Sequence, residues 1–200
     1  ITAIGRAPKG RYVTSKGAKP GDDILMTKGA GIEATAILAR DFGHLLPFEV
    51  SDQEIRRFTK QLSVVPEGLL AAEYGVHAMH DITEGGLLGA VREICQASRV
   101  GAEIKEVDVA IPQLTKAICE HFKLDPLGLL SSGSMLIVTP SGQDLVDRLG
   151  DIKVPAFVVG KITEGDHPVL VRKAGERQAI MAHVEDELWK FFRRIEGMVE

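Results

Sequence analysis

The sequence predicts a mixed-sheet α+β domain, and three features of the chain support that fold class. Seven or eight short apolar segments of strand type are interleaved irregularly with amphipathic segments of helical type. Hairpin signals occur near both ends of the chain. Strand–helix units fill its middle. We therefore expect a sheet of mixed strand direction with helices packed on it.

Composition favours a soluble globular domain and argues against two classes of partner. The 200 residues are 44% hydrophobic and 26% charged, which is ordinary for a protein with a buried core. The net charge of −4 argues against a nucleic-acid partner, which needs a basic, clustered surface. No apolar run reaches the roughly 18 residues that span a bilayer, so no membrane partner is expected.

The two cysteines favour a reducing compartment. Cys95 and Cys119 each lie among apolar residues of a predicted helix. They are spaced too widely for a metal pair and are too few for a secreted disulfide scaffold. We expect two buried thiols in a cytoplasmic protein.

The first fifteen residues are predicted to form an entry hairpin, with strands Thr2–Arg6 and Arg11–Ser15 around a Pro-Lys-Gly turn. We expect residues 1–15 to be the end of a missing N-terminal domain, and residues 16–200 to be a C-terminal α/β domain. The segment 5–10 superficially resembles a phosphate loop. A strand follows it instead of a helix, so we reject that interpretation.

The later elements follow from apolar periodicity, helix caps and turn residues. Predicted strands lie at residues 23–28, 76–81, 101–106, 135–138, 156–162 and 169–173. Predicted helices lie at residues 32–42, 51–62, 66–74, 84–98, 112–122, 141–149 and 185–194.

The main candidate site is the junction between the strand at 76–81 and the helix that follows it. Asp81, Ile82, Thr83, Glu84, Gly85 and Gly86 are consecutive there. Two glycines allow a phosphate to approach the backbone at the positive end of a helix. We take Asp81, Glu84 and His80 as candidate catalytic groups, and Thr83, Gly85 and Gly86 as phosphate or substrate ligands. Alternatively, Asp81 or Thr83 caps the helix and the glycines serve close packing.

Two further segments are candidates for the same site. Lys28, Gly29 and Gly31 surround a second strand–helix junction. Ser132 and Gly133 precede a core strand. Each set could bind substrate or phosphate; alternatively, Gly29 and Gly31 are packing glycines after a strand, and Ser132 and Gly133 form an ordinary turn.

No metal ligands are predicted. His77 and His80 are three residues apart on a strand, so their side chains point to opposite faces of the sheet. A single ion could not bind both without distortion.

Several motifs in order along the chain carry a family resemblance. They are residues 17–22, 27–29, 76–88, 93–94, 101–104, 124–127 and 132–138. Together they resemble the family of aminoimidazole ribonucleotide synthetase, which includes selenophosphate synthetase and thiamine-monophosphate kinase. The Leu124–Leu127 motif and the loop before the core strand fit the HypE-like hydrogenase maturation branch best.

The resemblance implies a fold, cofactors and partners. The chain would be the layered, distantly ferredoxin-like C-terminal domain of an ATP-dependent enzyme that phosphorylates or activates an amide-type or other acceptor. ATP and Mg²⁺ would bind mainly to an N-terminal domain, through which such proteins form homodimers. The implied partners are a small-molecule or protein-amide acceptor and a maturation protein. Asp81, Thr83, Gly85 and Gly86 would line the cleft between the domains.

Two departures from the HypE pattern change the expected substrate. HypE proteins have a motif similar to Asp-Pro-Thr-Arg-Gly-Gly at this junction, whereas this chain has Ile82 and Glu84 in place of the proline and the arginine. Arginine-to-glutamate exchange reverses the charge offered to an anion. The last eight residues contain no cysteine, so we expect no thiocyanate chemistry on this tail. The alternative is a partner-binding scaffold that keeps the fold without the chemistry.

Overall fold

A seven-stranded sheet forms the centre of the molecule, in the order β2-β4-β1-β5-β3-β6-β7. The computed structural model describes residues 2, 4–8, 10, 12–181 and 183–196. Adjacent strands pair antiparallel except β3 and β6, which are parallel, so the predicted mixed sheet is confirmed. The strands are β1 (Asp23–Thr27), β2 (Ala78–Asp81), β3 (Gly101–Lys105), β4 (Met135–Thr139), β5 (Ala156–Thr163), β6 (Pro168–Val171) and β7 (Arg177–Ala179).

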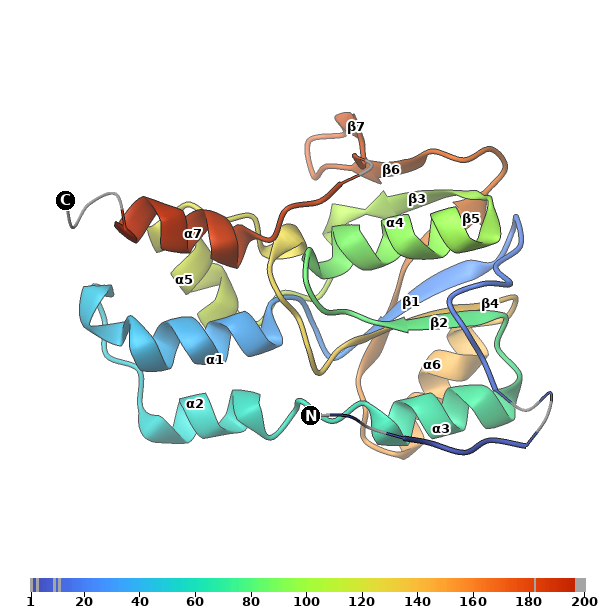
Figure 1. Ribbon diagram of the computed structural model, residues 1–200, viewed down its shortest axis with the longest axis horizontal. Helices are drawn as coiled ribbons and strands as arrows, with labels where there is room; N and C mark the ends of the chain where they lie inside the picture. The colour runs from blue at the N-terminus through green and yellow to red at the C-terminus, as the bar shows by residue number, and fades with distance from the viewer. Residues whose placement is uncertain (1, 3, 9, 11, 182, 197–200) are drawn as a thin grey trace.

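Helices cover both faces of the sheet and extend it at one end (Figure 1). One face is covered by α4 (Gly86–Ser98), and the other by α3 (Val65–Tyr74) and α6 (Gly142–Asp151). The helices beyond the strand ends are α1 (Ile32–Asp41), α2 (Asp52–Thr59), α5 (Gln113–Phe122) and α7 (Glu187–Glu196).

The central strands are buried because both of their faces are covered. Along β1, Ile24 and Met26 pack in the cluster on the α4 face, whereas Leu25 packs with α3 and α6. This alternation is the two-residue period of a strand. Every residue of β4 is buried, as expected for a strand that lies between two helical layers.

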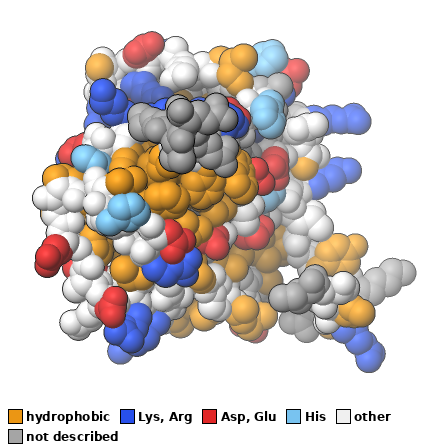
Figure 2. Space-filling model, turned by 60° about the vertical axis from the view of Figure 1, so that its left-hand side comes forward, with side chains coloured by type: hydrophobic (Ala, Val, Ile, Leu, Met, Phe, Trp, Pro, Cys, Tyr) orange, Lys and Arg blue, Asp and Glu red, His pale blue; other side chains and the backbone are white. Residues whose placement is uncertain are grey.

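The helices at the end of the sheet have their own apolar core. Leu38 of α1, Ile118 of α5 and Leu188 and Phe191 of α7 are buried together. The ring of Phe191 contacts that of Phe42 edge to face, with centroids 5.0 Å apart. Figure 2 shows hydrophobic side chains gathered on the surface at this end of the molecule.

One prediction of local structure is wrong for the described residues. Residues 2, 4–8, 10 and 12–15 contain no strand, so the predicted hairpin is not found in this part of the chain. Thr14 instead accepts a hydrogen bond from the N–H of Met79 on the edge strand β2 (3.1 Å). These residues are mostly exposed, and they lack the apolar face that holds a hairpin to a core. Residues 1, 3, 9 and 11 lie outside the described residues. The domain boundary at residue 15 stays a prediction.

The strand β7 is absent from the sequence prediction. All three of its side chains are exposed, so no apolar alternation marks it. It forms because Leu170 and its neighbours in β6 offer a free backbone edge.

The buried thiols are confirmed. Cys95 and Cys119 are free and buried. Burial raises the pKa of each thiol to about 12. No helix among the described residues has both the length and the apolarity to cross a membrane.

Candidate functional site

The predicted site residues lie at one end of the central strands. The strand β4 lies antiparallel between β2 and β1, so its start is beside the ends of both neighbours. Ser134 joins the two junctions: its carbonyl accepts from Ile82 N–H (2.9 Å), and its hydroxyl donates to the Gly29 carbonyl (2.6 Å). The structure therefore brings the three predicted segments, 28–31, 80–86 and 132–133, to one region.

Asp81 is an exposed acidic group at this end of the sheet. It is the last residue of the edge strand β2, and its side chain is 61% exposed. Thr83 follows it in the turn, and the Thr83 carbonyl accepts a hydrogen bond from Gly86 N–H (3.0 Å). A carboxylate and a hydroxyl two residues apart thus stand beside the start of α4.

His80 is held by a carboxylate that the sequence analysis did not assign to it. Its Nε2 lies 2.6 Å from a carboxylate oxygen of Glu93 on α4, and its Nδ1 lies 2.6 Å from the Asp81 carbonyl. Both ring nitrogens therefore face acceptor oxygens. Both nitrogens are thus engaged within the chain, so the predicted catalytic role of His80 stays a prediction. His77, which precedes β2, contacts Asp22 instead (2.8 Å).

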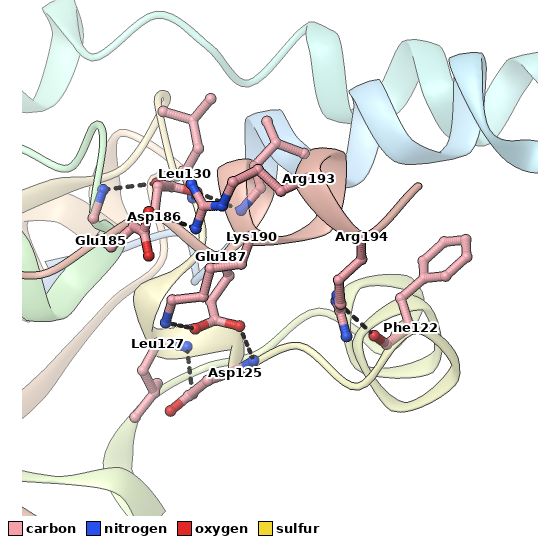
Figure 3. Close-up of polar contacts among 12 residues, drawn as sticks. Phe122, Asp125, Leu127, Leu130, Glu185, Asp186, Glu187, Lys190, Arg193 and Arg194 are labelled. Carbon is pink, nitrogen blue, oxygen red and sulfur yellow. Dashed lines mark hydrogen bonds and ion pairs between the residues drawn. The ribbon is translucent and has the colours of Figure 1, made fainter. Parts of the chain in front are cut away.

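The positive end of α4 already holds a carboxylate, Asp186. One oxygen accepts from Gly85 N–H (2.7 Å), and the other accepts from the N–H groups of Leu188 (2.8 Å) and Leu130 (3.3 Å). Figure 3 shows Asp186 beside Leu130 at the start of α7. A helix N-terminus attracts anions, and here the chain supplies its own.

The buried position of Asp186 has an electrostatic cost. Burial raises the pKa of this carboxyl, the three backbone N–H groups act in the opposite direction, and the charge of Glu84 adds to the rise. The sequence analysis missed Asp186. The available signal was an acidic residue just before an amphipathic helix, which is typical of a cap.

Gly85 and Gly86 serve close packing, which the sequence left open as the alternative. Gly86 has φ of 60°, and a Cβ there would meet the carbonyl oxygens of Leu127 and Leu129 at 2.6 and 2.7 Å. The N–H of Gly85 is taken by Asp186. Phosphate binding by these glycines therefore stays a prediction, and the Gly85 N–H is already used within the chain.

Lys28 is enclosed by protein groups. Its ammonium lies 2.7 Å from the Glu67 carboxylate and donates to the carbonyls of Gln61, Ser63 and Gly133 at 3.0, 2.7 and 2.7 Å. The side chains of Lys28 and Glu67 are 9% and 0% exposed. Lys28 thus clamps the loop that holds Gly133, and its predicted contact with phosphate stays a prediction.

The remaining glycines also touch neighbouring chain segments closely. A Cβ on Gly29 would lie 3.0 Å from the Ala110 carbonyl, and one on Gly31 would lie 2.7 Å from a methyl of Thr115. A Cβ on Gly133 would lie 2.7 Å from the carbonyl oxygen of Gln61. Ser132, beside it, is half-buried.

Glu84 turns toward α7. Its carboxylate accepts a hydrogen bond from the indole N–H of Trp189 (2.5 Å). The two residues lie at a polar groove of about 490 Å³ between α4 and α7. We call this the α4–α7 groove. It is lined by Glu84, Gly89, Arg92, Glu93, Gln96, His183, Val184, Glu185, Asp186, Trp189 and Arg193.

Comparison with known proteins identifies relatives of this domain. Residues 19–173 match the family described as AIR synthase related protein, C-terminal domain. The carbamoyl dehydratase HypE of Cupriavidus necator is 33% identical over 137 residues, which cover 68% of this chain and 38% of that protein.

Solved structures share the fold. Escherichia coli HypE superposes with a TM-score of 0.78 at 21% identity, covering 94% of this chain and 57% of that one. A HypE–HypF complex gives 0.73 at 19% identity, covering 84% and 55%. HypE in complex with ATP gives 0.66 at 20% identity, covering 90% and 55%.

The chain spans about two fifths of the curated relative and just over half of the solved chains. The matched family segment includes the β2–α4 junction, the Lys28 clamp and the loop before β4. The chain belongs to the family of AIR synthase related proteins and carries its C-terminal domain.

Proposed function

We propose that this chain is the acceptor-side domain of a HypE-like, ATP-dependent enzyme that phosphorylates or activates an amide-type or other acceptor. The observation that carries the proposal is the exposed end of β2 in a domain of this family, where Asp81 stands next to the Glu93-bound His80. Relatives named as carbamoyl dehydratases, and a HypE structure in complex with ATP, support the reaction class.

The chain's own residues would bind the acceptor and handle its proton. Asp81 is an open carboxylate that can accept a hydrogen bond or proton from the acceptor. His80, held by Glu93, positions the same strand end. Thr83 offers a hydroxyl two residues farther along. ATP, when bound, supplies the phosphoryl group.

Nucleotide binding needs groups from outside this domain. Asp81 is an oxygen ligand of the kind that Mg²⁺ prefers. Among the described residues, however, no group of three or more His, Cys, Asp or Glu side chains could hold a metal ion. The positive end of α4 is already bound to Asp186. We propose that ATP and Mg²⁺ are held mainly by the rest of a full-length protein.

The test is MgATP hydrolysis by the full-length protein with candidate amide acceptors. We expect Asp81→Ala to lower turnover by about a hundredfold or more, the usual weight of an acid–base group. Asp151→Ala, an exposed aspartate at the end of α6, is the matched control. Equal turnover in wild type and Asp81→Ala with every acceptor would rule out the assigned role.

A second candidate function is a partner-binding scaffold. Asp186 closes the helix start that a phosphate would use, and a hydrophobic surface lies at the end formed by α1, α5 and α7 (Figure 2). The structure of HypE with HypF supports a maturation protein as the partner. Recovery of a stoichiometric partner by the full-length protein, together with no nucleotide turnover, would favour the scaffold.

A further inference from the structure

The α4–α7 groove is a built polar site that the roles proposed for Asp81 and His80 leave unused. Its volume of about 490 Å³ lies within the usual range for small-ligand sites. One wall is the outward face of α4, and the other is the segment 183–186 with the first turns of α7.

Arg92 lines this groove, and no carboxylate of the described residues forms an ion pair with it. Its Nε is buried and has no hydrogen-bond partner among the described residues. In the part of the chain that the structure describes, its one hydrogen bond runs from a terminal nitrogen to the Asp166 carbonyl, at 3.4 Å. A guanidinium has five N–H donors, and Arg92 lines the groove, so its terminal nitrogens can donate to an acceptor atom of a ligand.

Arg193, the other arginine of the groove, is already neutralised. It lies 2.6 Å from the Glu185 carboxylate, a pair visible in Figure 3. The two residues therefore contribute little net charge to the groove.

The carboxylates of the groove argue against an anionic ligand. Glu84 accepts from the Trp189 indole, which is a neutral donor, so its negative charge is not cancelled. Glu93 also lines the groove and contacts His80. A phosphate or carboxylate beside Arg92 would be repelled by these groups.

A primary amide satisfies both kinds of group. Its carbonyl oxygen accepts from Arg92, and its NH₂ group donates to a glutamate such as Glu84. The indole of Trp189, which is 47% exposed, adds a flat apolar wall for a planar ligand.

We propose that the α4–α7 groove binds the carboxamide group of the acceptor. The inference rests on the proposed amide-activating function, because that function names an amide-type acceptor. It adds the place of binding and assigns recognition to Arg92, Glu84 and Trp189.

The chain contains a single tryptophan, so its fluorescence reports on this groove. We would titrate the protein with benzamide and, separately, with benzoate and inorganic phosphate. The expected result is a saturable change with benzamide, and affinities at least about tenfold lower for benzoate and phosphate. Equal or tighter binding of benzoate or phosphate would overturn the proposal.

The matched variants are Arg92→Met and Arg194→Met. Both remove one guanidinium, but Arg194 donates to the Phe122 carbonyl (3.0 Å) and is not part of the groove lining (Figure 3). Arg92→Met should weaken benzamide binding at least about tenfold, whereas Arg194→Met should leave it unchanged. Unchanged binding in Arg92→Met would overturn the assignment. If that variant fails to fold by circular dichroism, the wild-type preference for benzamide over benzoate decides.

Two experimental outcomes separate a failure of the groove proposal from a failure of the proposed function. Benzamide binding by a full-length protein that never turns over MgATP would contradict the proposed enzymatic function but not the proposed amide site in the groove. Acceptor-dependent turnover with the same KM for the acceptor in wild type and Arg92→Met would contradict the proposed amide site but not the proposed enzymatic function.

Discussion

Asp186 is the residue on which three chain segments converge. It is 1% exposed and accepts hydrogen bonds from the N–H groups of Gly85, Leu130 and Leu188. The sequence could not show this contact, because Gly85 and Asp186 are 101 residues apart. Its local setting indicated no more than the start of a helix.

Removing the Asp186 carboxylate should destabilise the fold strongly. Asp186→Ala leaves buried N–H groups without partners, which costs about 1–3 kcal/mol for each group that water does not reach. We expect a loss of about 3 kcal/mol or more in the free energy of unfolding, measured with urea. Asp147→Ala, at an exposed position of α6, should change it by less than about 0.5 kcal/mol. Similar values for both variants would contradict the structural role.

The same residue predicts a pH dependence. Burial raises the pKa of Asp186 in the folded state above its usual value of 3.8. Between the pKa of the unfolded state and the higher pKa of the folded state, the folded protein therefore binds more protons than the unfolded protein. The contribution of Asp186 to stability therefore falls as pH rises through that window. The difference in unfolding free energy between wild type and Asp186→Asn should shrink from near pH 3.8 upward. A difference that grows with pH would contradict the raised pKa.

At the scale of elements, the Lys28–Glu67 pair ties β1 to α3 and to the loop before β4. Both side chains are nearly inaccessible to water. Lys28→Met would leave a buried carboxylate uncompensated, so we expect a loss of about 3–5 kcal/mol in unfolding free energy. Lys28→Met combined with Glu67→Leu should recover much of it, because the unpaired charge is gone.

The control for this pair is an exposed one. Lys116 and Glu120 on α5 are 3.8 Å apart and more than half exposed. Lys116→Met should cost less than about 1 kcal/mol, as is usual for surface pairs. If Lys28→Met behaved in the same way, the clamp would have no energetic role.

The start of α4 needs glycine for packing. Gly86 has a positive φ, and an added Cβ would meet two carbonyl oxygens within 2.7 Å. Gly86→Ala should therefore lower the unfolding free energy by roughly 2–4 kcal/mol. Gly43→Ala, where an added Cβ meets nothing within 4 Å, is the control. Equal effects, measured by urea unfolding, would show that the close approach is not important.

At the scale of the whole molecule, the fold class and the clustering of the site were predictable. Apolar periodicity locates the six strands that have a buried face, from β1 to β6, and the mixed sheet follows from their order. The strand β7 is exposed, so its formation depends on pairing with β6. The predicted entry hairpin has no apolar face to pack and forms no strand in the described residues.

The details of the site were less predictable because they depend on contacts between distant segments. The sequence identified Asp81 and His80 as candidates, but the partner of His80, Glu93, lies on a separate element. The glycines fitted either phosphate binding or packing. Backbone atoms of Leu127 and Leu129 lie close to Gly86, and the Asp186 carboxylate accepts from the Gly85 N–H, so the structure shows close packing here and phosphate binding stays a prediction.

The central claim is that this chain supplies the acceptor side of an ATP-dependent site whose nucleotide side lies elsewhere. The most direct test is calorimetric titration of MgATP into the full-length protein and into this 200-residue chain. We predict that the full-length protein binds MgATP and that the chain alone binds it at least about a hundredfold more weakly, a difference of about 2.7 kcal/mol. Equal affinity in the two proteins would contradict the account.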